Sequence, residues 1–381
     1  MYTRNLFCLL VSSLLVVTQP LVAQTATKAR LNKPVVYAGI EVGAKGVKMS
    51  VVEMNMNAQK GSAYKTLKDT SVNSDFISFT QPSFFATLDG LVLLYHKAIT
   101  DFQLPGDRIF TAISSGVKGQ AEKENKQVWI SNLIDSFLVR IADPKRKVPV
   151  IDVLEEARLS HLGIVPEARR YATFLIDIGS GNTKGGYFPN GNTDDFNLFQ
   201  LNWGTKSTFN QTEKRCEDDK TLTNYYKQLN RVLAGAAGSD VVLAVNQSGA
   251  YSMNDYIAFS GGIAWSVSTL LYPELIDNPV VPVTYEEVEK LYHQLYQQYT
   301  SLSETVLSQH LADKALDKTL VAKEIKRVHT VFDQKALLAG TGLLLKIMRQ
   351  FQGVYEKKEF YLVKNGQVGW ISAYVKQQLN P

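Results

Sequence analysis

A short unit that occurs twice is the feature of this sequence that most constrains its fold. Residues 35–54 read VVYAGIEVGAKGVKMSVVEM: an apolar strand ends at Glu41, a glycine turn follows, and a second strand begins at Val47. Residues 173–188 read TFLIDIGSGNTKGGYF, where a strand ends at Asp177 and a glycine turn again leads into a strand. A strand–acid–turn–strand unit that occurs twice, at residues 35–54 and 173–188, predicts an α/β chain with two similarly folded domains that face each other.

Both turns have the composition of an anion-binding loop. Their glycines permit positive φ and let backbone N–H groups come close to a ligand. Successive N–H groups in a tight turn bind anions, and magnesium is held by one or two carboxylates together with phosphate oxygens. Taken singly, either turn is better explained as a hairpin whose acid is buried or caps a neighbour. Two turns in matching positions favour a site for phosphate groups and a divalent metal.

Between the two units, an apolar strand at 108–113 runs into Ser114, Ser115 and Lys118. Small hydroxyls and a cation at a strand end suit phosphate, but a serine-rich turn with a solvated lysine explains them equally well. The signal is therefore weak by itself.

Near residue 150 a short apolar strand leads to Asp152, and the spacing of apolar residues then predicts an amphipathic helix. Glu155 and Glu156 fall in its first turn, where the helix dipole favours acids. Helix capping is the better account of these two acids when they are considered alone.

The second half of the chain contains further element signals. Residues 256–271 predict a strand, a Ser260-Gly261-Gly262 turn and a helix, and Thr284 with Glu287 three positions later is a capping box that opens a helix. Residues 359–375 predict a hairpin with Asn365-Gly366 at its turn, followed by a helix.

Composition and the N-terminus limit the functional classes. Apolar residues make up 45% of the chain and charged residues 20%, which is typical of a globular protein rather than a disordered one. A basic start, an apolar run and Ala23 indicate a signal peptide over 1–23 and a flexible tail over 24–33, so we expect a periplasmic or secreted protein with no stable membrane span after cleavage. The scattered basic residues give no sign of nucleic-acid binding, and no histidine or cysteine spacing predicts zinc.

The order AGIEVGAKGVKMSVV, AISSGVK, EEARLSHLGIV, LIDIGSGNTKGGYF, AFSGG and LLAGTGLLL resembles the exopolyphosphatase and guanosine pentaphosphatase (Ppx/GppA) phosphohydrolases. These belong to the actin, sugar-kinase and Hsp70 superfamily, whose members have two ribonuclease-H-like, or actin-like, domains facing each other across a cleft. The resemblance covers about residues 35–375, and its most specific part is the EEARL segment followed by the Asp-Gly turn. It implies a first actin-like domain over 34–170 and a second over 171–381.

The resemblance also implies roles for individual residues. Glu156 matches the glutamate that activates water, and Glu41 and Asp177 match the acids that hold the metal, Mg²⁺ or another divalent cation, either directly or through water. The phosphate-binding positions are Gly43, Ala44, Lys45, Ser114, Ser115, Lys118, Gly179, Ser180, Gly181, Asn182 and Thr183.

Five positions depart from the family pattern. Glu41 stands where the family prefers aspartate, and Ala44-Lys45 replaces a hydroxyl and an amide of the first loop. Lys118 replaces an arginine and loses its bidentate fork. Ser180 replaces a glycine. These departures leave open a site that is altered in substrate, slow or retired.

The sequence therefore predicts an exported hydrolase that releases terminal phosphate from inorganic polyphosphate by metal-assisted water attack. An apyrase-like hydrolase of nucleoside polyphosphates is the alternative enzyme, and a non-catalytic binder of polyphosphate or nucleotide is the alternative outside enzymes. Homodimer formation stays open.

Overall fold

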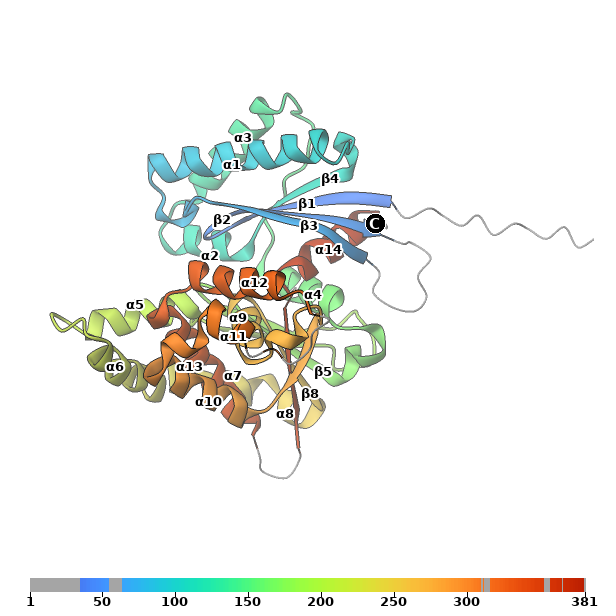
Figure 1. The fold of residues 1–381 in the computed structure, drawn as a ribbon. Helices are drawn as coiled ribbons and strands as arrows, with labels where there is room; N and C mark the ends of the chain where they lie inside the picture. The colour runs from blue at the N-terminus through green and yellow to red at the C-terminus, as the bar shows by residue number, and fades with distance from the viewer. Residues whose placement is uncertain are drawn as a thin grey trace, which may run out of the picture. The chain divides into compact units, whose positions relative to one another are not determined.

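Two β-sheets that match in topology over four strands organise the described part of the chain (Figure 1). The computed structural model describes residues 35–54, 64–309, 311, 316–352, 357–364 and 366–379. The first sheet has the order β3-β2-β1-β4, formed by β1 (Val35–Gly43), β2 (Gly46–Met54), β3 (Tyr64–Asn73) and β4 (Ile109–Ile113). The second has the order β7-β6-β5-β8-β10-β9, formed by β5 (Thr173–Ile178), β6 (Thr183–Tyr187), β7 (Asn197–Leu201), β8 (Tyr256–Ser260), β9 (Val280–Val283) and β10 (Glu359–Val363).

The repeat seen in the sequence is thus a repeat of strand pairing. β1 pairs antiparallel with β2 and parallel with β4, and β5 pairs antiparallel with β6 and parallel with β8. Each repeated unit is a hairpin inside its sheet, with a further strand paired on either side. The prediction of an α/β fold built on two related halves is confirmed.

Period-two alternation decides which residues of β1 and β5 face the helices of the core. In β1, Ala38, Ile40 and Val42 pack into one hydrophobic cluster, which leaves Glu41 on the opposite face. In β5, Phe174, Ile176 and Ile178 pack into the largest cluster, which leaves Asp177 on the opposite face. The two acids therefore lie away from the two main cores.

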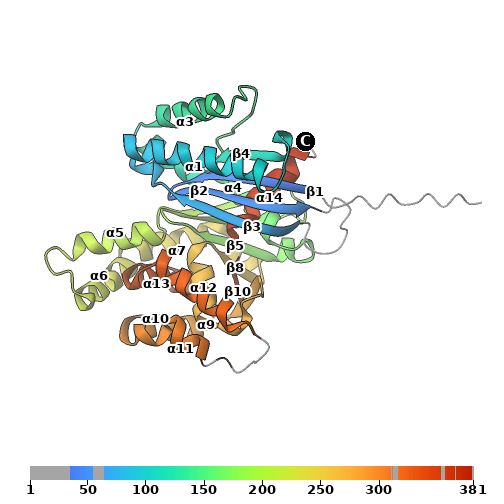
Figure 2. The same cartoon turned by 45° about the horizontal axis from the view of Figure 1, so that its top comes forward.

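The first sheet has helices on both faces. α1 (Gln81–Thr100) lies over one face with α3 (Gln127–Arg140) beyond it (Figures 1 and 2), and α2 (Ser115–Lys123) follows β4. On the other face, Val368 and Val375 of α14 (Gly366–Leu379) pack against Tyr37, Val52 and Met54. α14 also packs along α4 (Val153–Ile164), so this last described helix joins the two halves.

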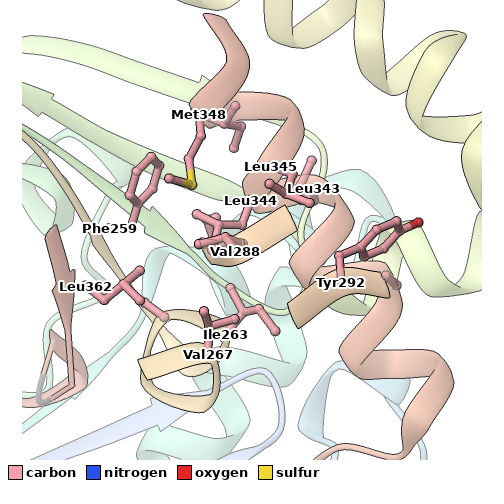
Figure 3. Close-up of a cluster of buried hydrophobic side chains, with 14 of the residues drawn as sticks. Phe259, Ile263, Val267, Val288, Tyr292, Leu343, Leu344, Leu345, Met348 and Leu362 are labelled. Carbon is pink, nitrogen blue, oxygen red and sulfur yellow. The ribbon is translucent and has the colours of Figure 1, made fainter. Parts of the chain in front are cut away.

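The second half is dominated by helices around one large core. Figure 3 shows its centre, where Phe259 of β8 and Leu362 of β10 meet Leu344 and Met348 of α13. The helices are α5 (Thr205–Arg215), α6 (Leu222–Ala234), α7 (Ala236–Ser248), α8 (Ala250–Met253), α9 (Gly262–Leu271), α10 (Tyr285–Gln297), α11 (Glu304–Gln309), α12 (Lys318–Val331) and α13 (Gln334–Phe351). Short 3₁₀ helices span Phe76–Ser78, Gly106–Arg108, Glu167–Ala172, Pro273–Leu275 and Tyr299–Leu302.

Local sequence signals place several helix starts correctly. Thr284 and Glu287 form the expected capping box at the start of α10. Asp152 caps α4 by accepting a hydrogen bond from the Glu155 N–H, so the expected helix after residue 152 is confirmed. The expected strand, turn and helix at 256–271 are β8 and α9.

Two local expectations were wrong. The hairpin expected over 359–375 is a strand, β10, followed by α14 from Gly366, and β10 pairs with β8 and β9. Gly366 serves close packing there, because a Cβ would lie 2.4 Å from Ser260 Cβ. Asn365 lies outside the described residues. The short strand expected before Asp152 is a single bridge between Ile113 and Val150.

The expected division at residue 170 remains a prediction. Pro34–Pro381 forms one compact unit, and α14 returns to the first sheet late in the chain. The expected signal peptide over 1–23 and tail over 24–33 lie outside the described residues. In the part that is described, no helix is long and apolar enough to cross a membrane.

Candidate functional site

The first hairpin delivers Glu41 to a cleft of about 780 Å³. The side chain is 9% exposed, and the Trp370 indole N–H donates a hydrogen bond to Glu41 Oε2 over 3.1 Å. Burial raises the pKa of Glu41, and the charge of Lys48, its cross-strand partner, opposes that rise. The carboxylate is therefore held by one donor from the last helix and one nearby cation.

The second hairpin delivers Asp177 to the same cleft. Parallel pairing sets Ser260 beside it, and the Ser260 hydroxyl donates to Asp177 Oδ1 over 2.9 Å. The turn that follows is fixed from outside, since the carbonyls of Gly179 and Ser180 accept from the N–H groups of Thr205 and Lys206 at the start of α5. The first N–H groups of α5 are thereby used by the turn rather than by a ligand.

Lys184 lies across the hairpin from Asp177 and carries the charge at the centre of the site. Its Nζ is 2.7 Å from Glu156 Oε1 and 3.6 Å from Asp177 Oδ2. Lys184 and Glu156 are both buried. Although burial acts to lower the pKa of Lys184, the charges of Glu156 and Asp177 outweigh it and raise that pKa above its ordinary value.

Glu156 joins this ion pair to the start of α2. Its Oε2 accepts a hydrogen bond from the Ser115 N–H over 2.6 Å. Burial acts to raise the pKa of Glu156, but Lys184 and the Ser115 hydrogen bond outweigh burial and hold the pKa below its usual range. Glu156 is therefore ionised at neutral pH, and each of its oxygens keeps a further lone pair for a ligand or a water.

The N-terminus of α2 has the features of an anion site. Ser114 is its N-cap, and the Ser115 hydroxyl is buried with no hydrogen-bond partner within the described chain. Gly116 follows, and a Cβ there would meet nothing within 4 Å. A helix start with positive dipole, a buried unpartnered hydroxyl and open space suits an anionic oxygen.

Two more lysines that the sequence singled out lie in the cleft lining. Lys45 Nζ lies over the Phe332 ring, 5.3 Å from its centroid, and burial together with Lys206 and Lys48 lowers the pKa of Lys45. Lys118 makes an exposed ion pair with Glu122 at 3.9 Å. Neither contact is strong, so both side chains are available to a ligand.

The cleft brings together nearly all the residues that the sequence selected. Its lining includes Glu41, Gly43, Ala44, Lys45, Ser114, Ser115, Lys118, Glu156, Asp177, Gly179, Ser180, Gly181 and Asn182. Thr183 is placed elsewhere: it is buried opposite Ile178, and its hydroxyl donates to the Trp203 carbonyl over 2.7 Å. Its place in the strand turns it toward the core rather than the cleft.

Sequence reasoning missed Lys184, Trp370 and Ser260. A signal for Lys184 was present, because a lysine stands seven positions after each acid, Lys48 after Glu41 and Lys184 after Asp177. Trp370 and Ser260 carried no comparable signal, since their contacts depend on how distant elements pack.

The acids do not fit a magnesium ion held directly by Glu41 and Asp177. Among the described residues, no three His, Cys, Asp or Glu side chains lie close enough together to hold a metal. Asp177 faces Ser260 with one oxygen and Lys184 with the other, and Glu41 accepts from Trp370. The cation present among these carboxylates is an ammonium.

No family model and no curated protein matches the sequence. Solved structures do match. A Ppx/GppA family member from Aquifex aeolicus has 15% identity and a TM-score of 0.58, over 90% of this chain and 98% of that one. An exopolyphosphatase-like protein has 12% identity and a TM-score of 0.57, over 90% of this chain and 100% of that one. An exopolyphosphatase from Cytophaga hutchinsonii has 13% identity and a TM-score of 0.55, over 90% of this chain and 98% of that one. The chain therefore has the fold of the Ppx/GppA exopolyphosphatase structures.

Proposed function

We propose that this protein binds inorganic polyphosphate in the cleft and hydrolyses its terminal phosphoanhydride bond. The observation that carries the proposal is the contact between Glu156 and the start of α2, at 2.6 Å from the Ser115 N–H. A buried carboxylate then stands directly beside a helix end suited to a phosphoryl oxygen. The likeness of fold to structures described as exopolyphosphatases supports the same reaction class.

The proposed reaction depends more on the positioning of water and phosphate than on the strength of the base. The water oxygen forms a bond to the terminal phosphorus, the bond from that phosphorus to the bridging oxygen breaks, and the shortened chain leaves with that oxygen. The water proton passes to the Glu156 carboxylate and then to solvent. A lowered pKa makes Glu156 a weak base, but phosphoryl transfer through a loose transition state depends mainly on orientation and charge stabilisation.

The charges lining the cleft suit a polyanion held at several points. Lys45 and Lys118 are supplied by the first half, and the glycine turns of both hairpins line the cleft, where backbone N–H groups of a turn can bind anionic oxygens. A divalent cation is left out of the reaction proposed here, since the donor set does not fit one.

The substrate choice rests on location. Export is itself a proposal, drawn from residues 1–23, which lie outside the described residues. An exported protein meets inorganic polyphosphate more readily than guanosine penta- or tetraphosphate, which are cytosolic. Nucleoside polyphosphates released outside the cell remain the second substrate class.

The test compares phosphate release by the wild-type protein and by Glu156→Gln, with long-chain polyphosphate and ATP in parallel wells. Glu155→Gln is the matched control, because Glu155 is the neighbouring acid on α4 and pairs with Arg158 instead. We expect Glu156→Gln to lower release by at least about 100-fold and Glu155→Gln to leave it within about twofold. Equal release by the two variants would contradict the proposal, and the preferred well identifies the substrate class.

One observation favours a binder without turnover. The Glu156–Lys184 pair is buried, and both carboxylate oxygens already have partners. Such a pair is also what a retired site would keep for stability, since removing one partner leaves a buried charge. A binder would retain polyphosphate affinity and release no phosphate above Glu156→Gln.

A further inference from the structure

The ammonium of Lys184 pairs with two carboxylates, and its charge also acts on a third. It contacts Glu156 at 2.7 Å and Asp177 at 3.6 Å, and its charge also acts on Glu41. Among the described residues, the other groups hydrogen-bonded to these carboxylates are donors as well: the Trp370 indole N–H, the Ser260 hydroxyl and the Ser115 N–H. The negative charge that the two hairpins bring together is therefore already compensated by the chain itself.

The arrangement is part of the repeat rather than an isolated substitution. In each hairpin the residue directly across from the acid is a lysine, Lys48 across from Glu41 and Lys184 across from Asp177. Strand pairing thus fixes a cation beside each acid, on the face that alternation turns toward the cleft.

A divalent ion would have to displace Lys184 to reach these oxygens. Lys184 is 7% exposed, and its described ion-pair partners are Glu156 and Asp177. Displacement would leave a buried ammonium beside a metal of the same sign, which costs more than the new metal–oxygen contacts return in a site with so few open ligands. Geometry and charge both oppose the exchange.

We propose that Lys184 supplies the positive charge that a divalent metal would otherwise supply, so that the cleft binds phosphate chains without a metal ion. The ligand class rests on the proposed function, whereas the claim about the cation does not. One ammonium carries half the charge of Mg²⁺ and cannot bridge two phosphate oxygens with fixed geometry, so the site is expected to hold its ligand with the turns and the α2 N-terminus as well.

The first test measures Mn²⁺ binding to the full chain by electron paramagnetic resonance. We expect no saturable Mn²⁺ binding by the wild-type protein. Lys184→Met leaves the acids without their cation and should bind Mn²⁺ at least about tenfold more tightly than the wild type. Lys118→Met is the matched control, because it removes a lysine from the same cleft whose ion-pair partner is Glu122. It should gain no Mn²⁺ affinity.

Two results would overturn the proposal. One is stoichiometric Mn²⁺ binding by the wild-type protein that disappears in Asp177→Asn, which would show that the metal displaces the ammonium. The other is a folded Lys184→Met protein that gains no Mn²⁺ affinity, which would show that these acids form no cation site. If Lys184→Met fails to fold, the Mn²⁺ titrations of the wild-type protein and of Asp177→Asn still test whether a metal binds at these acids.

A second measurement separates this inference from the proposed function. Binding of long-chain polyphosphate to the wild-type protein is compared in EDTA and in Mg²⁺. Equal affinity in both supports the inference, and binding in Mg²⁺ alone contradicts it. Absence of binding in both conditions would contradict the proposed function while the Mn²⁺ titration continues to test the role of Lys184.

Discussion

At the scale of single residues, α4 carries two buried titratable side chains, of which one is ionised and the other is neutral. Glu156 is kept ionised by Lys184, whereas His161 is kept neutral by its surroundings. The His161 ring lies edge-on to Phe188 with centroids 4.9 Å apart, and its Nε2 lies 2.9 Å from the Thr173 carbonyl, to which it donates. Burial, assisted by the charge of Arg170, lowers the pKa of His161 to about 4.

This lowered pKa predicts a loss of stability in mild acid. Below the ordinary value of 6.5, an unfolded His161 binds a proton that the folded protein excludes until about pH 4. The free energy of unfolding should therefore fall as the pH falls between these values, by up to about 3 kcal/mol. Urea unfolding across this pH range should show the slope in the wild type and in the exposed control His96→Gln, and lose it in His161→Gln. An unchanged slope in His161→Gln would rule out this account.

Residues 183 and 184 show what a sequence can and cannot decide at this scale. The acids, the glycine turns and Glu156, which the sequence selected because their types and order are distinctive, all line the cleft, and their roles stay predictions. Thr183 was selected and Lys184 was not, although alternation puts Lys184 on the side of Asp177. The phase of a strand after a glycine turn depends on how many residues the turn takes up, and the sequence leaves that number open.

At the scale of elements, the contact between α4 and α14 positions the site. α4 presents Glu156, and α14 presents Trp370 to Glu41. The helices approach closely at two glycines, since a Cβ on Gly163 would lie 2.0 Å from the Gly369 carbonyl oxygen. That contact involves backbone, which cannot move aside as a flexible side chain can.

We therefore expect Gly163→Ala to destabilise the protein by about 1–3 kcal/mol through overpacking of the two helices. Gly119→Ala is the matched control on α2, where a Cβ would meet nothing within 4 Å. It should be neutral or stabilise by about 0.5–1 kcal/mol, because alanine favours a helix. Chemical denaturation measures the free energy of unfolding of both variants. Equal values for Gly163→Ala and Gly119→Ala would show that α4 and α14 can separate without cost.

The helix α14 was placed less well by the sequence than α4. The Asn-Gly pair at its start favours a hairpin turn, and the sequence predicts one there. The structure shows instead that Gly366 allows close packing against Ser260. α4 was easier, since Asp152 and the acidic first turn mark its start. Local signals find helix starts, whereas close approach between distant elements leaves no local mark.

At the scale of the whole molecule, the two sheets share one pairing scheme over four strands and contribute their repeated hairpins to one cleft. The repeat in the sequence was enough to predict two similarly folded halves, because strand, acid and glycine turn recur in the same order. It was not enough to predict that α14 returns to the first sheet, since the repeat contains no counterpart to that helix.

A ligand that contacts both hairpins should stabilise the whole chain. Long-chain polyphosphate at a hundredfold excess over its Kd should add about 2.7 kcal/mol to the free energy of unfolding, measured as a rise in Tm. Because the chain has a net charge of +5, heparin at matched charge and the same ionic strength is the control. A rise in Tm as large with heparin as with polyphosphate would show a general polyanion effect and contradict a specific site.

The hydrogen bond from Trp370 to Glu41 joins residues that are 329 positions apart. During synthesis Glu41 leaves the ribosome long before Trp370, so the carboxylate has no indole partner until the segment between them has been made. Until α14 has been synthesised, the face of the first sheet that it covers is exposed to solvent, including Tyr37, Val52 and Met54. The nascent chain can form two hairpins in order, but it cannot finish the first half until it has made the second.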